Sequence, residues 1–156
     1  MKYRTPRISQ YLTGAKSACG LLYERNAYYC RADSSIGIHQ GLAQWIYTEI
    51  GEFGVVQVLA HEWGHHIQKT VALTTMVPMF TELQSDCLAG VYARDAQDRD
   101  ILTSETLAAA WLVALNAGDA LDTPWFNDNA HGNSVQGLFH FNQGFRLGAN
   151  ACYAMF

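Results

Sequence analysis

His61 and His65 are four residues apart, and Glu62 directly follows the first of them. On an α-helix, residues i and i+4 share one face, so both imidazoles can bind one metal ion. Glu62 lies next to that face and can meet a water molecule at the same ion. This His-Glu-x-x-His pattern is typical of zinc-dependent hydrolases, in which the histidines bind Zn²⁺ and the glutamate is the general base. The simpler alternative is a helix with surface histidines and an ordinary glutamate, so a helical context and a third ligand are needed.

The segment around the two histidines has the composition of a largely buried helix. Apolar residues recur over several turns between Gly54 and Leu73, and no proline interrupts them. This pattern predicts a helix over residues 54–72. A metal would pair buried polar groups that otherwise cost free energy. His66 points about 100° away from His65 around the helix, so we expect it to be solvated or to support the ligands from outside the metal site.

A third metal ligand is expected on the next helix, which is predicted over residues 80–97. Glu82 and Asp86 are four residues apart on it and share one face. Glu82 can complete a His₂Glu zinc site with His61 and His65. Asp86 can accept the remaining ring N–H of one histidine and so fix its tautomer. The alternative is a polar helix face, which is the more common meaning of two acids at this spacing.

Five blocks of sequence carry a resemblance to a known family: SACG (17–20), YYCRAD (28–33), LAHEWGHHIQ (59–68), ELQSDCLAGVYA (82–93) and HGNSVQ (131–136). In these blocks the chain resembles the neutral zinc metallopeptidase family of bacterial secreted or membrane-anchored proteins. The resemblance implies a zincin-type fold, with zinc on His61, His65 and Glu82 and with Glu62 as the base. The chain departs from the family pattern at Gly137, because an arginine is expected soon after the histidine–glycine pair.

These residues predict hydrolysis of an amide bond in a peptide or protein substrate. Glu62 would take a proton from the attacking water and pass it to the leaving amine. The carbonyl oxygen would become negative and need a hydrogen-bond donor. His131, which precedes a predicted helix, is the candidate donor; the alternative is that it only caps or packs locally.

Two other functions fit parts of this pattern. A zinc-dependent amidase acting on a non-protein amide, such as cell-wall peptide, would keep every metal residue and differ in the cleft. A non-enzymatic module would use zinc only to hold helices together. Glu62 argues against this second function, because a structural zinc site needs no base and is usually closed by a fourth protein ligand.

Composition predicts a single folded domain over residues 1–156. Hydrophobic residues make up 49% of the chain and charged residues 15%, which excludes disorder as the main state. The ten Lys and Arg residues are scattered and the net charge is -4, so nucleic-acid binding is not expected. No apolar run reaches the roughly 18 residues of a transmembrane helix. Residues 1–10 lack the apolar core of a signal peptide, and we expect them to be flexible or to derive from an expression vector.

Four cysteines point to disulfides and to an oxidising compartment. Cys19 and Cys30 flank a short segment and are natural partners. Cys87 and Cys152 would tie the Glu82 helix to the C-terminal tail. Four cysteines allow three pairings, and four buried thiols in a cytosolic protein are the alternative. Because disulfides persist outside the reducing cytosol, a secreted or extracytoplasmic location is predicted.

The predicted fold class is α+β, mostly helical, as a zincin-like minimal metallopeptidase domain with a short N-terminal β-hairpin. Short strands are expected over residues 27–30 and 35–38. The resemblance to zincins implies that the strand around residues 35–39 could pair with an extended peptide as an added edge strand. Segment 8–18 is expected to be irregular or a short helix. The predicted helices cover residues 41–50, 54–72, 80–97, 104–116 and 134–147.

Overall fold

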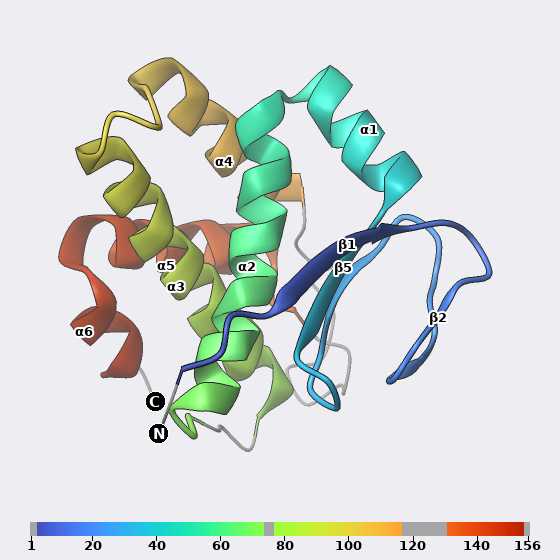
Figure 1. Cartoon of the computed structure of the whole chain (residues 1–156). Helices are drawn as coiled ribbons and strands as arrows, with labels where there is room; N and C mark the ends of the chain where they lie inside the picture. The colour runs from blue at the N-terminus through green and yellow to red at the C-terminus, as the bar shows by residue number, and fades with distance from the viewer. Residues whose placement is uncertain (1–2, 74–76, 117–130, 155–156) are drawn as a thin grey trace.

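The computed structural model describes residues 3–73, 77–116 and 131–154, and Figure 1 shows their arrangement. A small β-sheet lies beside a larger group of packed helices, which confirms the mostly helical α+β class. The strands are β1 (Arg7–Tyr11), β2 (Lys16–Ser17), β3 (Gly20–Leu21), β4 (Ala27–Cys30) and β5 (Ser35–His39). The helices are α1 (Gln40–Glu49), α2 (Glu52–Thr70), α3 (Pro78–Asp98), α4 (Ser104–Asn116), α5 (Ser134–Leu147) and α6 (Ala149–Tyr153).

The main sheet has the strand order β1-β5-β4. β5 pairs in parallel with β1 and antiparallel with β4, so the strands predicted over residues 27–30 and 35–38 are confirmed. β5 is buried along nearly its whole length, as expected for a strand with a neighbour on each side. The expectation that this strand offers an edge to a substrate is wrong, because β4 is the edge strand on that side.

The N-terminal segment belongs to the sheet. In the register of β1 and β5, Arg7 lies opposite Ser35 and Tyr11 lies opposite His39. The expected flexibility of residues 1–10 is therefore wrong for residues 7–10, and the irregular or helical segment over 8–18 is instead β1 followed by the small β2–β3 hairpin. The partner of β1 lies far along the chain, and for this reason short-range sequence patterns do not indicate the strand.

The helices predicted from apolar spacing are all present. α3 begins earlier than expected because Pro78 occupies its first turn, where a missing N–H costs nothing. α5 begins with a capping box: Asn133 Oδ1 accepts the backbone N–H of Gln136, and Gln136 Oε1 accepts the backbone N–H of Asn133. The short helix α6 at the C-terminal end is absent from the prediction.

α3 and α5 approach each other closely at two glycines. A methyl group at Gly90 would overlap the backbone carbonyl of Phe141, and one at Gly144 would overlap the carbonyl of Cys87. Only a residue without a side chain permits this contact. Phe141 is fully buried in the core beside Ala110 of α4. This packing fixes the position of α3, which carries the predicted third ligand on another face.

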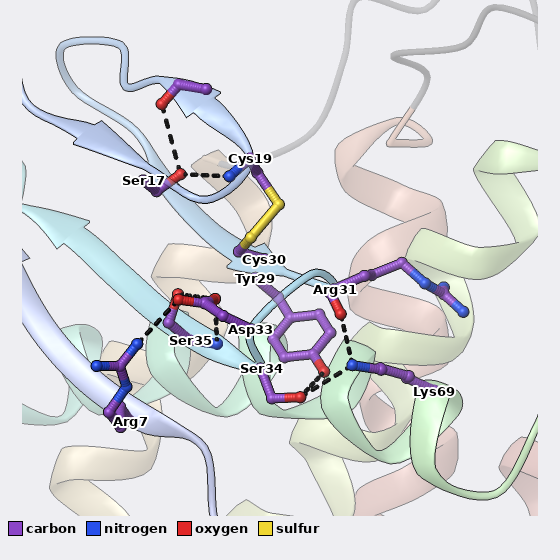
Figure 2. Close-up of a disulfide and its surroundings, with 11 residues drawn as sticks. Arg7, Ser17, Cys19, Tyr29, Cys30, Arg31, Asp33, Ser34, Ser35 and Lys69 are labelled. Carbon is purple, nitrogen blue, oxygen red and sulfur yellow. Dashed lines mark hydrogen bonds and ion pairs between the residues drawn. A yellow bond between two sulfur atoms is a disulfide. The ribbon is translucent and has the colours of Figure 1, made fainter.

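Both expected disulfides are present. Cys19–Cys30 joins the β2–β3 turn to the end of β4 (Figure 2), and Cys87–Cys152 joins α3 to α6. Among the described residues, no helix is long and apolar enough to cross a membrane.

Candidate metal centre

Three ligand atoms from two helices converge at one point. His61 and His65 come from α2, and Glu82 comes from α3. Glu82 Oε2 lies 3.1 Å from His61 Nε2 and 3.3 Å from His65 Nε2. Ligand atoms of the three residues all lie within 4.8 Å of one another. The structure thus brings together the three side chains that the sequence proposes as a ligand set.

Asp86 orients the first of these imidazoles. Its Oδ1 lies 2.8 Å from His61 Nδ1. An ionised carboxylate can only accept, so the Nδ1–H of His61 donates to it and the Nε2 lone pair faces Glu82. The fixed tautomer presents Nε2 as the metal-binding atom, which is the arrangement expected of a histidine ligand and its carboxylate partner.

Gln68 does the same for His65, and sequence reasoning missed it. The Gln68 side chain is buried, and its Nε2 donates to the carbonyl of Thr81 and to Gln84 Oε1. Its Oε1 therefore faces His65 Nδ1, at 2.9 Å, and accepts that N–H. The Nε2 lone pair of His65 is then directed at Glu82. The only sequence signal is that Gln68 follows His65 by three residues on the same helix face.

The donor set fits a zinc ion. Two imidazole lone pairs and one carboxylate point at the same region, and acceptors facing one another at these distances repel unless a cation lies between them. Two His and one Glu are the ligands of a known class of catalytic zinc sites, which leave one position open. The residues present therefore suit zinc by number, by chemistry and by the tautomers that their partners fix.

Without a metal ion, the surrounding carboxylates favour the protonated form of both imidazoles. Burial lowers the pKa of His61, but the carboxylates of Asp86 and Glu82 together raise it well above its usual value. Burial likewise opposes the raised pKa of His65, which the hydrogen bond to Glu82 brings about. For Glu82, burial raises the pKa, yet hydrogen bonds from both histidines hold it far below its usual range.

The two helices that carry the ligands touch at Gly64. A methyl group at this position would overlap Ser85 Oγ and lie 3.0 Å from the Ser85 Cα. Ser85 Oγ also donates a hydrogen bond to the backbone carbonyl of His61. Glycine inside the His-Glu-x-x-His segment therefore lets α2 and α3 approach closely enough for one ion to be shared between them.

Glu62 and the ligands line a cavity of about 770 Å³. Glu62 is 8% exposed. Burial raises its pKa, and the neighbouring His61 and His65 partly oppose this. A buried carboxylate with a raised pKa is a stronger proton acceptor at neutral pH than an exposed one.

His131 and Gly137 line the same cavity. His131 lies just before the capping residue of α5 and is close enough for its charge to lower the pKa of Glu62. A methyl group at Gly137 would lie 3.0 Å from Asp86 Oδ2. A side chain at this position, where the family resemblance implies an arginine, would therefore meet the carboxylate that orients His61.

His66 is not solvated as the sequence suggested. It is 3% exposed, and its Nε2 lies 2.7 Å from the carbonyl of Arg4 while its Nδ1 lies 3.0 Å from the hydroxyl of Tyr29. His66 thus attaches the N-terminal segment and β4 to the face of α2 that turns away from the metal ligands. Its role is to position the sheet rather than to hold the metal.

Comparisons with known proteins agree with this geometry. Residues 1–156 match the model of the family described as "Putative neutral zinc metallopeptidase". Over 94% of its length the chain is 26% identical to "Uncharacterized protein YpfJ" of Escherichia coli (strain K12), and it covers 60% of that protein. Over 96% of its length it is 27% identical to "Uncharacterized protein Rv2575" of Mycobacterium tuberculosis, and it covers 62% of that protein.

The chain therefore spans about 60% of the length of the curated relatives it matches. No solved structure matches it. The family model covers the whole chain, including both ligand helices. The chain belongs to the family described as putative neutral zinc metallopeptidases.

Proposed function

We propose that this domain is a zinc-dependent peptidase that hydrolyses peptide bonds with Glu62 as the general base. The observation that carries the proposal is the convergence of His61 Nε2, His65 Nε2 and Glu82 Oε2 beside a buried glutamate in a cavity. A zinc site that only held helices together would need no base and would usually have a fourth protein ligand.

Different residues of the chain would bind the metal and transfer the proton. His61, His65 and Glu82 would hold the zinc ion, and Asp86 would keep His61 in the required tautomer. Zinc, when bound, would act as a Lewis acid that lowers the pKa of water toward about 7. Glu62 accepts the proton of the attacking water and returns it to the amine that leaves.

His131 is the proposed donor to the negative oxygen that develops on the substrate carbonyl. It lines the cavity together with Glu62 and the ligands. A donor directed at developing charge stabilises the transition state, and because His131 is exposed we expect it to contribute less than the roughly 3 kcal/mol typical of a site shielded from water. Its loss should lower kcat while leaving zinc binding unchanged.

The substrate would lie along β4. This strand is the edge of the sheet, and Ala27 and Tyr29 of β4 line the cavity. An extended peptide can add to such an edge through main-chain hydrogen bonds. The two disulfides favour an extracytoplasmic location.

The test compares the wild-type protein with Glu62→Gln after loading with zinc. Both should bind one zinc ion, but only the wild type should cleave a peptide library analysed by mass spectrometry. We expect at least a 100-fold loss for Glu62→Gln, which is the lower range for removing a general base. Glu52→Gln is the matched control, because Glu52 lies on the same helix and is exposed. Equal turnover in Glu62→Gln and Glu52→Gln would contradict the proposal.

A further inference from the structure

The cavity is lined by charged side chains that do not belong to the metal centre. Its acidic side chains among the described residues are Glu62, Glu82 and Asp86, and all three belong to the metal cluster. Its remaining charged side chains there are Arg25 and Arg31. The charged side chains that line the described part of the cavity outside the metal cluster are therefore both cationic, although the chain as a whole has a net charge of -4.

The two arginines lie at opposite ends of β4 and differ in what they contact. The guanidinium of Arg25 stacks over the ring of Trp45, 5.6 Å from its centroid. Arg31 follows the last residue of β4 directly. In the described part of the chain it takes part in no ion pair, because the nearby Asp33 is paired with Arg7 at 2.9 Å. Figure 2 shows the Arg31 side chain extending away from Asp33.

The backbone of Arg31 is held firmly relative to the metal centre (Figure 2). Lys69 Nζ donates to the carbonyl of Arg31 and, at 2.9 Å, to Ser34 Oγ. Lys69 lies four residues beyond His65 on α2, so it fastens the β4–β5 turn to the helix that carries two ligands. The neighbouring residue Cys30 is bonded to Cys19. These contacts hold the Cα of Arg31 in place, so its exposed side chain starts from a fixed point at the rim of the cavity that it lines.

We infer that Arg31 binds a carboxylate of the substrate and so makes the enzyme prefer acidic peptides; this rests on the function proposed above. A guanidinium presents paired N–H donors that match a carboxylate, and it stays charged at every relevant pH. The carboxylate has two possible sources: an Asp or Glu side chain near the scissile bond, or the C-terminal carboxylate of a short peptide. Both sources supply the same chemistry to Arg31.

Binding measured without turnover tests this inference. Zinc-loaded Glu62→Gln protein is incubated with two pools of randomised eight-residue peptides, one with free and one with amidated C termini. The retained peptides are identified by mass spectrometry. We expect roughly fivefold enrichment of acidic over amide side chains at one position, or of free over amidated termini, which is the upper range for a solvent-exposed ion pair. The first result assigns the side chain as the source, and the second assigns the terminus.

Adding Arg31→Gln should abolish whichever preference is seen, and Arg31→Glu should reverse it toward Lys or Arg. Arg146→Gln is the matched control, because Arg146 is exposed, lies on α5 and does not line the cavity. Absence of both preferences, or a preference that persists in Arg31→Gln, would overturn the inference. If the zinc-loaded wild type cleaves no peptide, the proposed peptidase function is contradicted. The peptide-binding result for Arg31 can still be interpreted, because the binding assay does not depend on cleavage.

Discussion

Each imidazole of the metal centre has its own fixed acceptor, and the two acceptors differ in charge. His61 donates to the Asp86 carboxylate, whereas His65 donates to the neutral amide of Gln68. A carboxylate partner raises the basicity of the ring more than an amide does. Asp86 therefore both raises the basicity of the His61 ring and fixes its orientation, whereas Gln68 only fixes the orientation of the His65 ring.

Replacing Gln68 by Met should weaken zinc binding by about 10–100-fold, the usual effect of removing a partner that orients a ligand. The ring of His65 would lose the acceptor that fixes its tautomer. Competition with a chromophoric chelator measures the affinity. Gln57→Met is the matched control, because Gln57 is an equally buried glutamine on α2. Equal affinities in the two variants would show that the Gln68 contact does not act on the metal.

The zinc-free protein should lose stability as the pH rises above neutrality. The pKa values of His61 and His65 are raised above the ordinary 6.5 in the folded state. Their contribution to the free energy of unfolding is therefore fully present below pH 6.5 and disappears as the pH rises through the raised pKa values. Zinc binds deprotonated rings, so the zinc-bound protein should lack this decline. Thermal unfolding with and without zinc across this pH range measures both, and identical profiles would contradict the linkage.

The sequence alone identified the candidate residues whose placement follows from their spacing along one helix. The pairs His61–His65 and Glu82–Asp86 are both separated by four residues, and each pair shares a face as expected. Gln68 was missed because its orientation depends on acceptors on α3, across the helix interface. The buried position of His66 likewise depends on contacts with distant strands, which spacing along α2 does not reveal.

At the scale of elements, α2 and α3 come close enough for the proposed zinc ion to bind both helices only because Gly64 lets them touch. Gly64→Ala would force the new methyl group against Ser85. We expect a loss of about 1–3 kcal/mol in the free energy of unfolding, the usual range for overpacking. Zinc affinity should fall as well, because separating the helices moves Glu82 away from the histidines. Chemical denaturation and chelator competition measure the two effects, and a variant with unchanged zinc affinity would refute the link between helix contact and metal geometry.

The order of the strands was the least predictable part of the fold. The strands predicted over residues 27–30 and 35–38 are present as β4 and β5, and the helices predicted over 104–116 and 134–147 coincide with α4 and α5. The pairing of β1 with β5 is parallel and joins distant segments, so no turn between adjacent strands signals it. This unpredicted pairing covers the other side of β5, so β5 is the central strand and β1 and β4 are the edges.

At the scale of the whole molecule, a chain of contacts runs from the C-terminal helix to the metal centre. The carbonyl of Cys152 accepts from Gln84 Nε2, at 3.1 Å. Gln84 Oε1 in turn accepts from Gln68 Nε2, and Gln68 Oε1 faces His65. The disulfide to Cys87 holds Cys152 against α3. The C-terminal helix therefore helps to determine the orientation of His65, a proposed zinc ligand that lies far away in the sequence.

The two disulfides should consequently differ in their effect on zinc. Removing Cys87–Cys152 by a double change to Ala should cost about 2–5 kcal/mol of stability and also weaken zinc binding. Removing Cys19–Cys30 should cost about 1.5 kcal/mol less, because the loops closed span 65 and 11 residues. It should leave zinc affinity unchanged, since this bridge contacts the sheet and not the glutamine network. Denaturation curves and chelator competition on both double variants provide the comparison. If both variants bind zinc as tightly as the wild type, the contacts from Cys152 to His65 contribute nothing to the metal centre.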